Sequence, residues 1–583
     1  MKIPFHPTPT LLCHNNANLF RLTVCDLSPL FPMLRLTEVR LGLNHRETEL
    51  KAAILRALGI PGPELLGWHI RRRGYDARKS GEILLVYTLD VEVKDEAALL
   101  ERLQHGHHVT LAPDETYRYP VRAPANPKTR PVVIGTGPCG IFAGLALARM
   151  GFRPVILERG KSVRERTQDV WSLWRERHLN PESNVQFGEG GAGTFSDGKL
   201  HTGIKDRGHH IRQLLKDFVD AGAPAEILYI SKPHIGTLRL VKVVEQLREK
   251  ILELGGEIRF ESRVTDILVE DGDVQGRTSA AGGRMPRAAA VRGVTLAGGE
   301  TIAADHVVLA VGHSARDTFE MLYRRGVHIE PKPFSIGFRI EHPQHLIDVC
   351  RLGKHAGNPV LGAADYKLVH HCRNGRDVYS FCMCPGGQVV AATSEAGRVV
   401  TNGMSHYSRN ERNANAGIVV GITPADFGSH HPLAGIGLQQ QLEQQAYVLG
   451  GSNYNAPAQL VGDFLAGRAS TGPGSVIPSY TPGVTWTDLS TALPDYAIAA
   501  IREAIPAFEK QLKGFAMHDA VLTGVETRTS APIRIARNEN FESVNMQGLY
   551  PAGEGAGFAG GIISAAVDGM KVAEAVAQKI IQT

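Results

Sequence analysis

One stretch near position 130 constrains the fold of this chain more than any other. Residues 130–160 read RPVVIGTGPCGIFAGLALARMGFRPVILERG. A β-branched run enters a glycine turn at Gly135, Gly137 and Gly140, and a helix-prone segment then leads to a second apolar strand that ends at Glu158. Such glycines allow a tight turn and the close approach of a pyrophosphate, and the free N–H groups of the following helix point at it. The stretch therefore predicts a βαβ unit that binds a dinucleotide, with Glu158 placed to accept ribose hydroxyls.

A second glycine-rich element lies near the other end of the chain. Residues 548–569 read GLYPAGEGAGFAGGIISAAVDG, which predicts a strand, a glycine corner and a helix that starts near Ile562. Two phosphate-binding elements at opposite ends of one chain suit FAD better than NAD. An ordinary strand-turn-helix that closes the fold is the alternative interpretation.

Two further segments have the features expected of a cofactor site. Residues 186–200, QFGEGGAGTFSDGKL, have the glycines that let a backbone pass close to a cofactor, although a flexible surface loop is the alternative. Residues 306–314, HVVLAVGHS, run from an apolar strand into Gly312. We expect both segments to contribute to the same cofactor site.

Further motifs complete a family resemblance, and they are KPHIGT (232–237), VVLAVGHSARDTF (307–319), PFSIGFRIEHPQ (333–344), FCMCPGG (381–387), NGMS (402–405), ETRTSAPIRI (526–535) and YPAGEGAGFAGGI (550–562). With them, the chain from about Leu34 to its end resembles the bacterial family of uncharacterised FAD-dependent dehydrogenases, within the glutathione-reductase-type FAD-binding superfamily. The resemblance implies FAD and redox chemistry but no named substrate.

The resemblance also implies where parts of the cofactor lie. The N-terminal unit would hold the adenosine and pyrophosphate, with Val264 beside the adenine. Glu554 would hold the ribityl chain, and the helix that starts at Ile562 would point its N-terminus at the flavin. The residues expected to bind the cofactor are Gly135, Gly137, Pro138, Gly140, Glu158, Arg159, Gly190, Gly191, Gly193, Thr194, Ser196, Lys199, Val264, Gly312, Gly553, Glu554, Gly560, Gly561 and Ile562.

The reacting residues are harder to choose from the sequence. Cys382 and Cys384 offer thiols that could act as a redox relay or a nucleophile, or form a buried structural pair. His234 could move a proton and Arg528 could hold an anion, although a structural hydrogen bond or salt bridge is the alternative for each. We select His234, Cys384 and Arg528 as catalytic candidates. We expect no metal, although Cys372 with His370 or His371 could add ligands to the Cys382–Cys384 pair.

Composition narrows the class of protein. At 583 residues the chain should form several domains, and 43% apolar with 21% charged residues is ordinary for a globular protein. A net charge of +5 does not by itself argue for nucleic acid, and no apolar run of membrane-spanning length is present. Seven cysteines, an odd number with uneven spacing, predict no disulfide framework and favour a cytoplasmic protein.

The expected fold is α/β. It combines a Rossmann-like FAD-binding domain of glutathione-reductase type, a small N-terminal α+β domain of ferredoxin-like type, and an inserted β-rich substrate domain. The first segment, 1–33, looks like a disordered leader, with a targeting peptide as the alternative. The expected domains are the small α+β domain at 34–121, the discontinuous FAD-binding domain at 122–323 and 522–583, and the inserted substrate or cap domain at 324–521.

Two functions fit these patterns. The first is an FAD-dependent oxidoreductase that transfers a hydride between FAD and a small-molecule substrate, with NAD(P)H as a possible transient reductant and a separate redox partner possible. The second is an FAD-binding protein that associates with nucleic acid, such as a tRNA-modifying flavoprotein. It would use the basic run Arg71, Arg72, Arg73, Arg78 and Lys79, for which a solvated strand face is the favoured interpretation.

Overall fold

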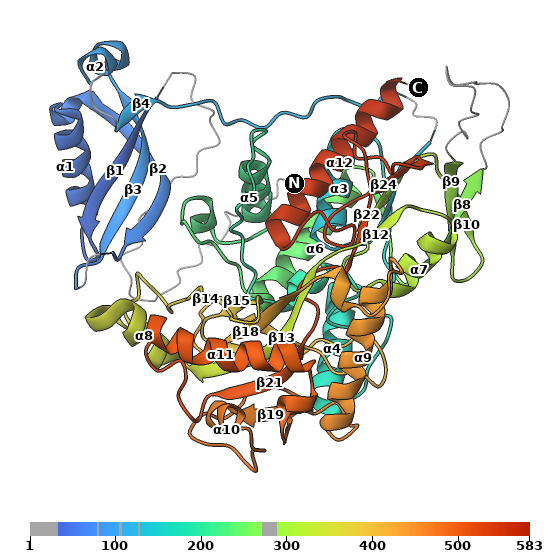
Figure 1. Ribbon diagram of the computed structural model, residues 1–583. Coiled ribbons are helices and arrows are strands. Elements are labelled where there is room, and N and C mark those ends of the chain that lie inside the picture. Colours follow the sequence, from blue (N-terminus) through green and yellow to red (C-terminus); the bar gives the residue numbers. More distant parts are fainter. Residues whose placement is uncertain (1–32, 79–80, 104–107, 126–128, 271–288, 583) are drawn as a thin grey trace, which may run out of the picture. The chain divides into compact units, whose positions relative to one another are not determined.

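The computed structural model divides the chain into two compact units, of which the first ends at Pro113 and the second begins at Asp114 (Figure 1). The expected leader (apart from Met33) and Lys79 of the basic run lie outside the described residues. Among the residues that are described, no helix is both long and apolar enough to cross a membrane. The described residues are 33–78, 81–103, 108–125, 129–270 and 289–582.

The first unit is a four-stranded antiparallel sheet with two helices. Its strands lie in the order β2-β3-β1-β4, which gives the β-α-β-β-α-β connectivity of ferredoxin-like folds. Leu50, Ile54 and Leu58 recur at helical spacing on α1 and are buried against apolar residues of the sheet. The elements are β1 (Leu34–Gly42), α1 (Glu47–Leu58), β2 (Leu65–Asp76), β3 (Leu84–Val93), α2 (Glu96–Leu103) and β4 (Val109–Leu111).

The basic run lies on β2 and just beyond its end. Arg71 lies 3.7 Å from a carboxylate oxygen of Asp90, and Arg78 lies 2.6 Å from one of Asp76. The unit therefore supplies carboxylate partners for at least these two arginines.

A five-stranded parallel sheet organises the second unit. Its strands lie in the order β24-β11-β5-β6-β7. Alternate residues point to opposite faces, so Val133 and Val308 pack in one buried cluster while Val132 and Leu309 pack in another. The strands are β5 (Val132–Ile134), β6 (Val155–Leu157), β7 (Glu257–Arg259), β11 (Val307–Leu309) and β24 (Leu549–Pro551).

Helices cover the Val133 face of this sheet, and a second, mainly antiparallel sheet of short strands lies on the other. The helices α3 and α12 run side by side (Figure 1), although they come from opposite ends of the unit. The second sheet contains β8, β9, β10 and β23. The elements are α3 (Pro138–Arg149), α5 (His210–Asp220), α6 (Thr237–Glu253), α12 (Ile562–Gln582), β8 (Val264–Glu270), β9 (Ala289–Leu296), β10 (Thr301–Ala303) and β23 (Met546–Gln547).

A seven-stranded sheet lies within the segment between residues 333 and 526. Its order is β14-β15-β18-β13-β21-β19-β20, and α11 packs against β13, β14, β15 and β18. A hairpin of β16 and β17 lies beside it. The elements are β13 (Phe334–Pro343), β14 (Val369–His371), β15 (Asp377–Cys384), β16 (Gly387–Ala391), β17 (Thr401–Ser405), β18 (Asn413–Ile422), α9 (Ala434–Leu449), β19 (Ala456–Leu460), β20 (Val484–Trp486), α11 (Asp495–Gln511) and β21 (Val521–Glu526).

Two boundaries differ from those expected. The segment 522–526 was assigned to the FAD-binding domain, but it belongs to β21, which pairs with β13 and β19 of the seven-stranded sheet. The first compact unit ends at Pro113 rather than at Val121. In both cases hydrogen-bonded neighbours distant in sequence decide where a segment belongs.

The close packing of α3 and α12 gives a test of the fold. A Cβ atom added at Gly569 would lie 2.1 Å from the carbonyl oxygen of Cys139, so Gly569→Ala should force the helices apart and lower the free energy of unfolding by about 1–3 kcal/mol. Gly437→Ala is the matched control, because Gly437 is also helical but has no atom within 4 Å of the added Cβ. Thermal melting should show a lower midpoint for the first variant only. Equal midpoints for the two variants would contradict this packing.

Candidate functional site

A cavity of about 410 Å³ lies at the carboxyl end of the five-stranded sheet. Parallel α/β sheets commonly bind their ligands at this end. The glycine-rich segments around Gly135 and Gly560 both line this cavity, although they are more than four hundred residues apart in sequence. The residues expected to bind a cofactor that line the cavity are Gly135, Gly137, Pro138, Glu158, Arg159, Gly191, Gly193, Ser196, Lys199, Val264, Gly312, Glu554, Gly560, Gly561 and Ile562.

Four of the expected cofactor residues are not among those that line the cavity. Gly140 and Gly190 are packing positions, since an added Cβ would lie 1.9 Å from the Gly135 carbonyl oxygen and 2.1 Å from the Thr194 hydroxyl, respectively. The carbonyl of Thr194 accepts a hydrogen bond from the Thr237 hydroxyl at 2.7 Å. The N–H of Gly553 donates to Asp568. These residues pack against or hydrogen-bond to the segments that form the cavity wall.

The first glycine turn has the shape of a phosphate cradle. Gly135 has a φ of +102°, and an added Cβ would lie 2.4 Å from the carbonyl oxygen of Ala310. Gly137 is the N-cap of α3, and Pro138 is among its first residues, where a missing N–H leaves no helical bond unmade. The N-terminus of α3 thus faces the cavity with free N–H groups, which suits the pyrophosphate of a dinucleotide.

Glu158 organises the turns around the cavity. One of its oxygens accepts from the N–H and the hydroxyl of Thr136, at 2.9 and 2.6 Å, and the other accepts from the N–H groups of Gly160 and Gly188, both at 2.9 Å. A carboxylate has about four acceptor positions, and the chain itself occupies all of them. This differs from the expected role, because no acceptor position of Glu158 is left for a ribose in this arrangement.

Arg166 is a residue that sequence reasoning missed. Its fully buried guanidinium donates to the carbonyl oxygens of Asn184, Val185, Gly188 and Glu189 at 2.7–3.2 Å, and burial lowers its pKa to about 10. Arg166 therefore fixes the backbone of residues 184–189, at the start of the glycine-rich segment 186–200. A single arginine on an amphipathic helix carries no sequence signal of this role.

Cys382, rather than the expected Cys384, lines the cavity. The pairing of β15 with β18 has a register shift between Phe381 and Cys384, and Cys382 adopts a φ of +41° there. The shift exposes the side chain of Cys382 to the cavity, whereas Cys384 is completely buried. Cys384 therefore does not line the cavity, and its expected catalytic role stays a prediction.

Two cations lie beside the two thiols, Arg339, which is buried, and Lys199, which is half-buried. The Arg339 guanidinium donates to the carbonyl oxygen of Cys382 at 3.0 Å, and the Lys199 ammonium donates to the carbonyl of Met383. A hydrogen bond from the Cys384 thiol, together with Lys199 and Arg339, holds the pKa of Cys382 well below its usual range. The pKa of Cys384 is raised because it donates to Cys382 and is buried. These contacts favour the ionised form at Cys382 rather than at Cys384.

The other two catalytic candidates are already engaged. The ring of His234 stacks on Tyr407, its Nε2 lies 3.0 Å from the Tyr407 carbonyl oxygen, and it is not among the cavity-lining residues. Arg528 reaches the cavity wall, but Glu443 binds it at 2.8 and 2.9 Å and its remaining contacts go to the hydroxyls of Ser314 and Ser394. These contacts are those of structural residues, and the expected catalytic roles of His234 and Arg528 stay predictions.

Glu554 lines the cavity. It is half-buried, and its desolvation raises its pKa to about 7, against the opposing effects of Lys332 and of the Gly561 N–H. Together with the glycine cradle and the N-terminus of α12, this donor set fits a phosphate-containing cofactor with a polar ring.

Family comparison agrees with the geometry. Residues 333–529 match the family described as FAD-dependent protein, C-terminal domain-like, and residues 33–92 match a domain of unknown function (DUF8436). This match and the cavity together define an FAD-dependent protein built on a parallel α/β sheet, with FAD as its cofactor.

A close relative shows the family. An uncharacterised protein of Clostridium beijerinckii is 47% identical over 547 residues, which cover 94% of this chain and 99% of that protein. The chain belongs to the same family as this protein.

Similar solved structures are more distant. Halogenase PltM matches at 12% identity with a TM-score of 0.34, covering 78% of this chain and 70% of its own. A flavocytochrome c3 fumarate reductase matches at 12% identity with a TM-score of 0.31, covering 79% of each chain. CtdE, solved in complex with FAD, matches at 10% identity with a TM-score of 0.28, covering 78% of this chain and 91% of its own.

The thiolate gives a first prediction for the site. Iodoacetamide should alkylate Cys382 at a lower pH than Cys350, because the pKa of Cys382 is lowered by its neighbours whereas that of Cys350 is raised by burial. Peptide mass spectrometry of one sample measures both rates, so Cys350 is an internal control. In Cys384→Ala, the pH profile of Cys382 should move upward because its hydrogen-bond donor is lost. Identical profiles for Cys382 and Cys350 would contradict the cluster.

Glu554 gives a second prediction, in flavin-stripped protein. Its pKa of about 7 exceeds the ordinary 4.5, so the folded state holds a proton that the unfolded state has lost between these values. Stability should therefore fall as pH rises from about 4.5 to 7, by about 1.4 kcal/mol per unit of pKa difference. Glu554→Gln should make this dependence of the melting midpoint shallower, whereas the exposed Glu539→Gln should leave it unchanged. A slope in Glu554→Gln as steep as that of the parent protein would assign the proton to another group.

Proposed function

We propose that this protein is an FAD-dependent oxidoreductase, with the FAD-binding part of glutathione-reductase type, that transfers a hydride between FAD and a small organic molecule. When bound, FAD supplies the two-electron redox chemistry. The observation that carries the proposal is a single cavity in which the glycine cradle, the N-terminus of α12 and the Cys382 thiol meet. NAD(P)H is proposed as a transient reductant, and the cytoplasm as the location.

Different residues would bind the two parts of the cofactor, at the two ends of the cavity. The turn at Gly135 and Gly137, with the N-terminus of α3, would bind the pyrophosphate, and Val264 would contact the adenine. At the other end, α12 begins at Ile562, and the positive end of its dipole would stabilise negative charge on the ring. Glu554 would bind a polar group between the two.

Cys382 is the residue proposed to act on the substrate. Its Sγ can take the proton that leaves a substrate hydroxyl as the carbon atom is oxidised, since its thiolate is the form that the surrounding cations stabilise. The neighbouring Asn402 and Phe381 also line the cavity and offer a hydrogen-bonding and an apolar contact for the substrate. Lys199 would keep the thiolate charged between turnovers.

The nucleic-acid alternative rested on the basic run of the first unit. Because Arg71 and Arg78 of that run already pair with Asp90 and Asp76, the structure adds no observation in its favour.

An anaerobic absorbance titration tests the proposed function. The purified protein should show a bound flavin band that NADH, NADPH or a component of a metabolite pool bleaches with saturation. Cys382→Ala should keep the flavin band but slow its bleaching by the substrate by about 10²–10⁴-fold, the usual contribution of a positioned proton acceptor. Cys350→Ala is the matched control, because Cys350 is not among the cavity-lining residues.

Three outcomes separate the parts of the proposal. A protein that binds no flavin, even after FAD is added, would overturn it. Flavin that neither nicotinamide nor the pool bleaches would leave FAD in a role other than hydride transfer. Equal bleaching rates in Cys382→Ala and Cys350→Ala would remove Cys382 from the reaction.

A further inference from the structure

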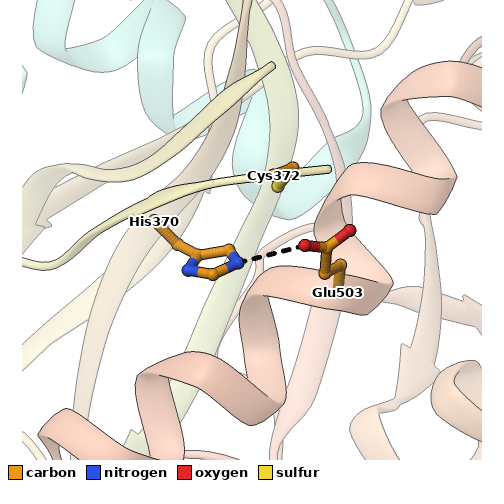
Figure 2. A group of neighbouring side chains, drawn as sticks. All are labelled: His370, Cys372 and Glu503. Carbon is orange, nitrogen blue, oxygen red and sulfur yellow. Dashed lines mark hydrogen bonds and ion pairs between the residues drawn. The ribbon is translucent and has the colours of Figure 1, made fainter. Parts of the chain in front are cut away.

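A second group of reactive side chains lies outside the FAD cavity. His370 is on the edge strand β14, Cys372 follows that strand by one residue, and Glu503 is on α11 (Figure 2). None of the three lines the cavity described above. His370 and Cys372 are separated by one residue, so an extended strand places both on the same side, toward α11.

The three side chains present one ligand atom each to a common point. The histidine nitrogen, the thiol sulfur and a carboxylate oxygen all lie within 4.8 Å of one another. Nε2 of His370 lies 3.3 Å from Oε1 of Glu503, as the dashed line in Figure 2 marks. Nitrogen, sulfur and oxygen ligands in one site suit Zn²⁺, which accepts all three and prefers four ligands in a tetrahedron.

The surroundings hold these ligands in place. The backbone N–H of Arg373 donates to both oxygens of Glu503, at 3.1 and 3.3 Å, which fixes the orientation of the carboxylate. The N–H of Cys372 donates to the carbonyl of Arg376 at 2.8 Å across the hairpin. The side chain of Asn374, in the turn, donates to the carbonyl of Tyr496 on α11 at 3.0 Å. Outer contacts of this kind orient the ligands of metal sites.

Two of the three candidate ligands are partly exposed to solvent. Cys372 is buried, whereas the side chains of His370 and Glu503 are 27% and 31% exposed. A thiolate and a carboxylate together would balance the charge of a divalent cation. The open side leaves room for a fourth ligand from water, as in zinc sites with three protein ligands.

We propose that His370, Cys372 and Glu503 bind one Zn²⁺ ion, with water as the fourth ligand. The ion would tie the edge strand β14 to α11 and would replace the hydrogen bond between His370 and Glu503 with two metal bonds. The Arg373 N–H would remain on the carboxylate as an outer contact. The site does not depend on FAD or on the proposed oxidoreductase activity.

Cobalt is the probe that tests this site, since Co²⁺ bound by a thiolate gives an absorbance band and occupies zinc sites. The full-length protein, stripped of metal with a chelator, should bind one equivalent of Co²⁺ with this band, and Zn²⁺ should displace it. Because flavin absorbs in a nearby region, difference spectra against the same sample without cobalt are recorded. Cys372→Ser should lose the band, and His370→Gln and Glu503→Gln should weaken Co²⁺ binding at least tenfold.

His371→Gln is the matched control. His371 neighbours two of the ligands in sequence, but its ring contacts Asp377 at 2.6 Å instead of the site, so this variant should bind Co²⁺ as the parent protein does. The flavin spectrum of each variant checks that it is folded. A thiolate band that persists in Cys372→Ser, an equal loss in His371→Gln, or no band in the folded parent protein would each overturn the proposal.

Discussion

The parallel register of three strands is the constraint on which the cofactor site depends. Ile134, Leu309 and Pro551 lie side by side at the ends of β5, β11 and β24. The chain leaves these three strands at the same height, so the Gly135 turn, the segment around Gly312 and the segment around Glu554 all reach one cavity. The site is thus assembled by strand pairing between segments that no local sequence pattern joins.

Buried charges fix the wall of this cavity. Glu443 on α9 binds both Arg316 and Arg528, and these arginines hold its pKa well below the usual range despite its burial. Removing one partner of such a group leaves an uncompensated charge in the interior, which typically costs about 3–5 kcal/mol. Arg528 is therefore best understood as part of a rigid wall, even though its position beside the cavity suggests a substrate contact.

The sequence predicted the local elements of the site well and its long-range contacts poorly. Glycine spacing and strand-helix order are local, so the lining positions at both ends of the chain could be identified. Cys382 and Cys384 could not be separated, because regular alternation puts both on one face and the register shift that separates them depends on pairing with β18. The contact of His234 with Tyr407 could not be predicted, because the two residues are far apart in sequence.

The cations near Cys382 pair with carboxylates, and this pairing limits the positive charge that can stabilise a thiolate at Cys382. Arg339 is fully buried and pairs with Glu526 at 2.7 Å, while Asp197 lies 3.7 Å from the Lys199 ammonium. Burial raises the pKa of Glu526 in spite of Arg339. The thiolate consequently depends on Lys199 and on the Cys384 hydrogen bond as well as on Arg339. Its reactivity is a property of four side chains from different parts of the chain, held together by the fold of the second unit.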